Sequence, residues 1–177
     1  MATVSLSAAT ITALGIDPGS NVTGWGVVRE CSGSLSLVAC GALRVKGATF
    51  PERIACIYHG LRAVIEEHRP DEAGVEQVFA AKNVQSTIKL AQARGAAIAV
   101  CASFGLPVLD YEPTLVKKTL VGTGRAEKDQ VAYMVTRLLG QASMEGPLDV
   151  TDALAIAVCH LTLRRFRRWE ELSRLDG

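Results

Sequence analysis

The sequence predicts an α/β protein in which helices cover a five-stranded mixed sheet. Two observations support this fold class. Near the N-terminus, three short apolar segments are separated only by turn residues, which is typical of antiparallel neighbours. Further along the chain, segments of strand length alternate with longer segments of helical periodicity, which is typical of parallel strands joined by helices.

Three strands are expected first, over residues 13–16, 25–29 and 35–45. Residues 18–21 (PGSN) and 31–34 (CSGS) separate them and have the composition of turns. Connections this short join antiparallel strands, whereas parallel strands need a longer crossover. The first three strands are therefore expected to form an antiparallel meander.

The rest of the chain alternates between the two periodicities. Pro51 suits the first turn of a helix, and Gly105 and Pro107 suit the end of another. The expected elements are, in order, a helix over 51–68, a strand over 73–79, a helix over 83–103, a strand over 108–111, a short helix from Pro113 to the glycines at 122 and 124, and helices over 127–139 and 149–168. This order of elements is that of a ribonuclease H-like fold.

Length and charge limit the functional classes. At 177 residues and 49% hydrophobic content, the chain fits a single domain over residues 1–177. A formal net charge of +1 excludes a uniformly basic nucleic-acid-binding protein, but the cations gather in two stretches, residues 117–128 and 164–168. The ordinary role of the second stretch is to complement the C-terminal end of the last helix.

The cysteines and the apolar segments indicate a compartment. Five cysteines are an odd number, and none forms a CxxC pair, which fits a reducing environment. The N-terminal residues lack the basic start of a signal peptide, and no apolar stretch approaches the ~20 residues of a membrane span. We therefore expect a cytoplasmic protein.

Four acidic residues lie at the margins of apolar segments. Asp17 follows the apolar residues 13–16, Glu76 follows residues 73–75 (AGV), and Asp149 and Asp152 begin the last predicted helix. Charged side chains in such places are rarely buried unless a cation meets them, and clustered carboxylates are typical ligands of divalent metal ions. The four acids indicate a metal-dependent nuclease.

Each acid also has an ordinary structural interpretation. Asp17 precedes Pro-Gly and could open a turn, and Glu76 could face solvent through strand alternation. Asp149 and Asp152 share one helix face, but acids at a helix N-terminus also cap it and complement its dipole. These interpretations are independent of one another, so all of them would have to coincide to replace the metal site.

Local sequences over about residues 14–163 resemble the RuvC family of bacterial Holliday junction resolvases. Any one of the matching stretches is weak alone, and together they are specific. They are residues 15–20 (GIDPGS), 23–24 (TG), 76–79 (EQVF), 81–83 (AKN), 89–90 (KL), 92–95 (QARG), 116–117 (VK), 121–122 (VG), 126–128 (AEK) and 152–155 (DALA). Residues 1–13 form an N-terminal extension and 164–177 a basic C-terminal tail outside this match.

The resemblance implies a homodimeric endonuclease that cuts two opposed strands of a four-way DNA junction symmetrically. By motif match, the catalytic and metal-binding carboxylates are Asp17, Glu76, Asp149 and Asp152. Two Mg²⁺ ions per site are implied, with Mn²⁺ as a substitute, and Asp17 is the candidate bridge between them. The resemblance also implies the branch-migration proteins RuvA and RuvB as partners.

Further residues are candidates for DNA contacts. Family resemblance implies that Phe79 stacks against bases near the crossover, and burial in the core is its alternative. Lys117 and Lys128 match family lysines near the scissile phosphate. Three other cations, Lys82, Lys118 and Arg125, have the right charge for phosphate contacts but are also typical of solvated loops and helices.

Two other functional classes remain open at this point. A catalytically inactive junction-binding protein would keep the fold without cutting, although all four acids are present. A nucleotide-binding module of the actin and heat-shock chaperone type also begins with an Asp-containing turn after a strand. The chain shows no second glycine-rich phosphate turn, which such a module would need.

Overall fold

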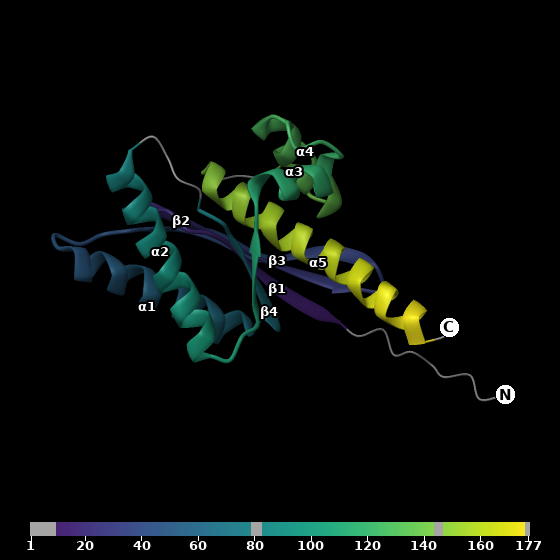
Figure 1. Ribbon diagram of the computed structural model, residues 1–177, viewed down its shortest axis with the longest axis horizontal. Coiled ribbons are helices and arrows are strands. Elements are labelled where there is room, and N and C mark those ends of the chain that lie inside the picture. The colour runs from purple at the N-terminus through teal and green to yellow at the C-terminus, as the bar shows by residue number, and fades with distance from the viewer. Residues whose placement is uncertain (1–9, 79–82, 144–146, 176–177) are drawn as a thin grey trace.

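The computed structural model describes residues 10–78, 83–143 and 147–175, with residues 167–175 described by their backbone alone. Five strands form one sheet in the order β3-β2-β1-β4-β5 (Figure 1). Their bounds are β1 Ile11–Asp17, β2 Val22–Cys31, β3 Ser34–Arg44, β4 Glu72–Glu76 and β5 Val108–Tyr111.

The strand directions confirm the predicted mixed sheet. The first strand, β1, lies in the middle, antiparallel to β2 and parallel to β4. The β2–β3 pair is antiparallel and the β4–β5 pair is parallel. Three meandering strands followed by two parallel ones thus make an α/β sheet of the ribonuclease H-like type.

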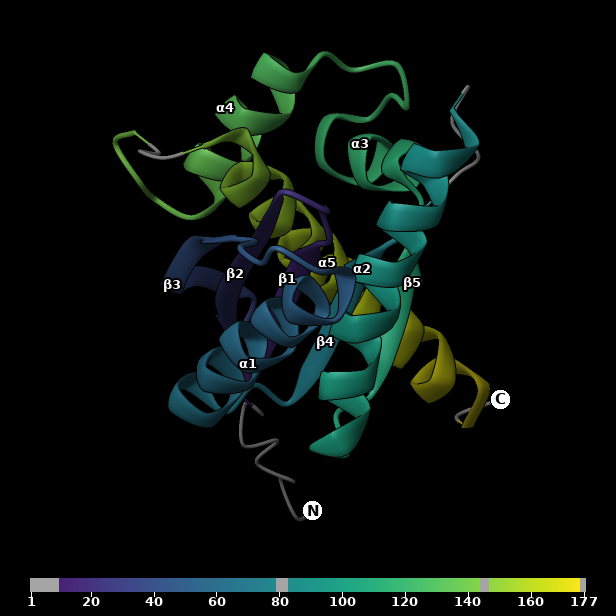
Figure 2. The same ribbon diagram turned by 90° about the vertical axis from the view of Figure 1, so that its left-hand side faces the viewer.

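Helices cover both faces of this sheet. On one face, α1 (Phe50–His68) and α2 (Val84–Ser103) lie side by side (Figures 1 and 2). On the other, α5 (Leu148–Leu175) crosses the strands beside the shorter α3 (Pro113–Val121) and α4 (Lys128–Leu138). Each face has its own apolar core, because alternate residues of β1 point to opposite faces: Leu14 joins the core under α1 and α2, and Ala13 the core under α5.

Local sequence explains where α1 and α2 begin. Pro51 lies in the first turn of α1, and the Glu52 carboxylate accepts hydrogen bonds from the backbone N–H groups of Ala48 and Thr49 at 2.7 and 3.2 Å. Asn83 caps α2 through its side-chain oxygen, which accepts from the N–H groups of Gln85 and Ser86. Both helices start at the same end of the sheet as the turn between β1 and β2 (Figure 2).

Two glycines allow α5 to lie directly on the sheet. A Cβ atom on Gly24 of β2 would overlap the carbonyl oxygen of Asp149, and one on Gly15 of β1 would overlap that of Ala153. Any larger residue at either position would push the N-terminal half of α5 outward. The backbone contact at Gly24 therefore sets how closely the first turn of α5 approaches the ends of the strands.

Two sequence-based expectations about element ends are wrong. The strand expected over 73–79 ends at Glu76, because β5 ends at Tyr111, the residue opposite Glu76, and offers no further partner. Arg164 does not complement a helix end, since α5 continues to Leu175. Its Nε instead donates to Glu72 Oε1 at 2.8 Å and ties the helix to β4.

All five cysteines are free thiols, and Cys101 and Cys159 are buried. In the described ranges, no helix has the length and apolarity that a membrane span requires.

Candidate active site

Four carboxylates line one pocket of about 290 Å³ at the edge of the sheet. They are the four that the sequence singles out: Asp17 ends β1, Glu76 ends β4, and Asp149 and Asp152 lie in the first turns of α5. Lys117 of α3 and Lys128 of α4 line the same pocket. Residues separated by up to 135 positions thus converge here.

The strand register brings the first two acids together. Ile16 of β1 pairs with Val75 of the parallel strand β4, so the next residue on each strand, Asp17 and Glu76, emerges at the same edge. Carboxyl ends of neighbouring parallel strands always meet in this way. The spacing of three between Asp149 and Asp152 places both on the side of α5 that faces this edge.

The electrostatics of the pocket are unfavourable for four free carboxylates. Burial raises the pKa of Asp17 to about 8, with further increases from the charge of Glu76, a hydrogen bond shared with Glu76, and the charges of Asp152 and Asp149. Burial and then the charge of Asp152 raise the pKa of Glu76, although the hydrogen bond from Asp17 and the charge of Lys128 oppose this shift. The raised pKa favours the protonated form of Asp17 near neutral pH, in a hydrogen bond with Glu76.

One cation already contacts the acids. Lys128 Nζ donates to Asp152 Oδ2 at 2.9 Å, and this hydrogen bond, followed by the charge of Asp152, raises the pKa of Lys128. The side chain of Lys128 is 61% exposed, so it can leave Asp152 without losing a buried position. Lys117 is half-buried at the rim of the same pocket.

The donor set fits a hard divalent cation. Carboxylate oxygens are the ligands that Mg²⁺ and Mn²⁺ prefer, and a positive ion would offset both the burial and the neighbouring negative charges that raise the pKa of Asp17. Within the described residues, no three acidic, His or Cys side chains are already arranged as a finished metal site. The carboxylates border the pocket, where Asp17 and Glu76 share a hydrogen bond and Asp152 contacts Lys128.

The other predicted DNA contacts are not part of this pocket. Lys118 and Arg125 are exposed and do not line it. Phe79 and Lys82 lie outside the described residues. Contact of these four side chains with DNA stays a prediction.

Comparison with known proteins identifies the family. Residues 13–160 match the family model for "Crossover junction endodeoxyribonuclease RuvC". The chain belongs to the RuvC family. It is therefore a nuclease, a hydrolase that resolves Holliday junctions, and the nucleotide-binding module considered from its first hairpin is set aside.

Individual RuvC proteins are similar over nearly their whole length. The RuvC of Oleidesulfovibrio alaskensis is 62% identical over 158 residues, which cover 89% of this chain and 95% of that protein. The RuvC of Nitratidesulfovibrio vulgaris strain DP4 is 56% identical over 161 residues, 91% and 96% of the two chains. Among solved structures, Thermus thermophilus RuvC in complex with a Holliday junction substrate superposes with a TM-score of 0.82 at 32% identity, covering 88% of this chain and 96% of that one.

Sequence reasoning missed a residue that supports the RuvC carboxylates. Arg94 of α2 donates through Nε to the backbone oxygen of Glu76 at 3.2 Å, and its Nη2 lies 2.6 Å from Asp110 Oδ1 on β5. It therefore holds the last residue of β4 against the neighbouring strand and helix. Arg94 belongs to a stretch that matches the family, 92–95 (QARG), but nothing in its local sequence indicates a contact with the end of a strand 18 residues earlier.

Proposed function

We propose that Asp17, Glu76, Asp149 and Asp152 bind two Mg²⁺ ions and that the chain, as a homodimer, cuts two opposed strands of a Holliday junction symmetrically. The observation that carries this proposal is the convergence of the four carboxylates in one pocket with Lys117 and Lys128 at its rim. Each phosphodiester would be hydrolysed directly by water.

The bound ions would supply an activated water and stabilise the leaving oxygen, which is the chemistry of two-metal phosphodiester hydrolysis. Asp17 suits the bridging position, because it lies in the central strand and interacts with Glu76, Asp152 and Asp149. Glu76 and the two acids of α5 approach from different sides and would complete the oxygen ligands. Mn²⁺ would replace Mg²⁺, since both accept such ligands.

Lys128 and Lys117 would orient the scissile phosphate. Both are cationic and border the carboxylates, and Lys128 is free to exchange Asp152 for a phosphate oxygen once metal neutralises the acid. Phosphate contacts of this kind position the DNA without reading its sequence. Recognition of the junction therefore has to come from the arrangement of two sites and from contacts outside the pocket.

A homodimer would supply the two sites. Symmetric cuts on opposed strands require two active sites related by a two-fold axis, which is the commonest symmetry of homo-oligomers. The outward side of α2 carries the exposed small residues Ala91, Gly95 and Ala99, which would let a second copy approach closely. Size-exclusion chromatography with light scattering tests the dimer, and a single-chain mass at micromolar concentration would contradict it.

The cellular context of the proposal follows from the family. RuvA and RuvB, which move the branch point, would be the partners, and the cytoplasm would be the compartment. Residues 1–177 would act as one nuclease domain, since both apolar cores lie on the two faces of a single sheet. The partnership is tested by adding RuvA and RuvB to a cleavage reaction: a changed rate or position of cutting supports it, and an unchanged pattern contradicts it.

Cleavage of a synthetic mobile four-way junction tests the proposed mechanism, with linear duplex of the same sequence as the control. Mapping both strands at nucleotide resolution in Mg²⁺, Mn²⁺ and EDTA should give paired nicks at symmetric positions, and only with metal. Junctions that are bound but never cut with any divalent ion would instead identify an inactive junction-binding protein.

A further inference from the structure

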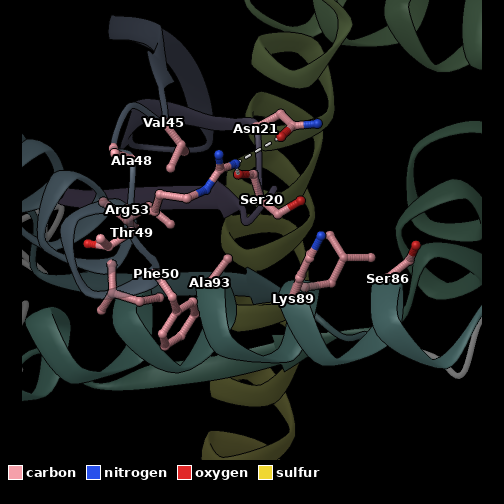
Figure 3. A pocket seen from close by; sticks show the side chains of 14 residues that line it. Ser20, Asn21, Val45, Ala48, Thr49, Phe50, Arg53, Ser86, Lys89 and Ala93 are labelled. Atoms are coloured by element: carbon pink, nitrogen blue, oxygen red, sulfur yellow. Dashed lines mark hydrogen bonds between the residues drawn. The ribbon is translucent and has the colours of Figure 1, made fainter.

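A second polar pocket lies on the opposite face of the sheet from α5. It has a volume of about 460 Å³, within the range of ligand-binding pockets, and is formed by the turn after β1, the segment before α1, and the first turns of α1 and α2. Figure 3 shows its side chains converging from these four segments. None of the residues that line it belongs to the carboxylate pocket.

The charge of this second pocket is of one sign. Arg53 and Lys89 line it, and among the described residues it has no acidic lining residue. The remaining polar lining includes the hydroxyl groups of Ser20 and Ser86, which are neutral hydrogen-bond donors, whereas the hydroxyl of Thr49 is already hydrogen-bonded to Glu52. Two cations with hydroxyl donors and no carboxylate form a setting for an anion, in contrast to the acidic pocket on the other face.

Arg53 is held in place by the turn that follows β1. Its Nη2 donates to the backbone oxygen of Ser20 and, at 2.9 Å, to Asn21 Oδ1 (Figure 3). Both partners are neutral, so the positive charge of Arg53 is oriented without being neutralised. The fork of a guanidinium has five N–H donors, and those not used by the turn remain for a ligand.

Lys89 faces the same space from α2. Within the described part of the chain it has no hydrogen bond or ion pair. Figure 3 shows its side chain rising from α2 toward the turn that carries Ser20. An unpaired lysine and an oriented arginine thus flank the same opening from two helices.

We propose that this second pocket, which we call the Arg53–Lys89 pocket, binds a backbone phosphate of the junction DNA away from the scissile bond. One short segment links it to the catalytic centre: Asp17 contributes to the carboxylate pocket, and Ser20, three residues later, to the Arg53–Lys89 pocket. A strand cut at Asp17 therefore passes close to this turn. The inference rests on the proposed function, since it assigns the second site to the same DNA.

Salt dependence of junction binding provides the test, measured with full-length protein in Ca²⁺ or EDTA to suppress cutting. Lys89→Gln removes a charge that has no partner in the fold, so it should not unfold the protein. In Lys89→Gln with Arg53→Gln, which removes the one proposed phosphate contact, the slope of log affinity against log salt should become shallower by about 0.9, and in Lys89→Gln alone by a part of that. Arg62→Gln is the control, because Arg62 lies on α1, pairs with Glu66 and does not line the pocket.

The outcomes separate the two proposals. If wild type cuts junctions but Lys89→Gln retains the wild-type slope, the inference about the Arg53–Lys89 pocket is overturned and the proposed function stands. If wild type neither binds nor cuts junctions, the proposed function itself fails. If inorganic phosphate raises the melting temperature of wild type and not of Lys89→Gln while the junction slope is unchanged, the pocket binds a small anion instead, which also overturns the inference.

Discussion

Lys128 Nζ lies 2.9 Å from Asp152 Oδ2, so a lysine at the rim of the carboxylate pocket forms an ion pair with one of the acids that we assign to metal. The two residues come from different helices, α4 and α5, and 24 positions separate them. The contact neutralises part of the excess negative charge while no metal is present. If Asp152 binds metal as proposed, metal and lysine would compete for it, and metal binding would free the lysine for phosphate.

This competition predicts opposite effects of Lys128→Gln on metal binding and on cleavage. Without the lysine, the free protein should need less Mn²⁺ for half-maximal thermal stabilisation, while cleavage of bound junction should fall by about 10²-fold through loss of a transition-state contact. Arg137→Gln, which alters a cation elsewhere on α4, is the control. Weaker Mn²⁺ binding by Lys128→Gln would show that the lysine supports the metal site and does not compete with it.

Metal binding should release protons near neutral pH. The pKa of Asp17 is raised to about 8 mainly by burial, so at pH 7 this group is mostly protonated until metal displaces the proton. Isothermal titration with Mn²⁺ in buffers of different ionisation enthalpy should give about one proton per site at pH 7 and much less at pH 9. Asp17→Asn should abolish the release, and equal heats in all buffers for wild type would contradict the assignment.

The contact of Gly24 with α5 predicts that Gly24→Ala damages the site. Its Cβ would overlap the carbonyl oxygen of Asp149, so the start of α5 must move away from Asp17. We expect the free energy of unfolding to fall by about 1–3 kcal/mol, and each kcal/mol lowers the melting temperature by about 2–4 °C. Metal-dependent cleavage should weaken as well. Glu66→Gln is the control, because it removes only an exposed ion pair with Arg62 on α1 and should change stability by less than about 1 kcal/mol. Equal melting temperatures for the two variants would refute the spacing argument.

A buried network between α5 and the strands β4 and β5 predicts acid sensitivity. Glu72 accepts from His160 Nε2 and Arg164 Nε at 2.8 Å each, and the second nitrogen of His160 lies 3.0 Å from the Tyr111 hydroxyl. Burial alone would raise the pKa of Glu72, but the hydrogen bonds and charges of Arg164 and His160 outweigh it and lower the pKa. The stabilisation is therefore present above about pH 4.5 and is lost as the pH falls through the lower folded-state value.

Glu72→Gln should accordingly cost about 1–3 kcal/mol at pH 7, because it leaves the fully buried His160 without its charged acceptor. Urea unfolding from pH 7 to pH 3.5 measures the difference from wild type, which should shrink below about pH 4.5. Glu66→Gln, which removes an exposed surface partner of Arg62, is the control and should change stability by less than about 1 kcal/mol. A Glu72→Gln deficit that stays constant across this range would contradict the role of the ionised carboxylate.

The topology and the four acids could be predicted from sequence because their signals are local. Turn residues and periodicity give the element order, and each acid lies directly at the end of an apolar segment. The strand over 73–79 was extended too far because Val78 and its neighbours continue the apolar pattern. Whether a strand continues depends on a partner, and β5 has none to offer beyond Tyr111.

The supporting contacts could not be predicted because they join residues that are distant in the chain. Arg94 meets the end of β4 across 18 positions, and Arg164 meets Glu72 across 92. From its sequence, a charged residue such as Arg164 near the end of a predicted helix could have several roles. The packing of α5 across the sheet places Arg164 beside Glu72 and so decides its role. The same holds for Arg53 and Lys89, whose shared pocket depends on two helices lying side by side.

Single-turnover cleavage of a four-way junction by Asp17→Asn tests the central claim most directly, with binding measured in the same samples. Asparagine keeps the size of the side chain and removes the charge that Mg²⁺ requires, so junction binding should persist while the rate of paired cutting falls by several orders of magnitude. Cleavage by Asp17→Asn at a rate close to that of wild type would contradict the account of the four carboxylates as the metal-binding catalytic site.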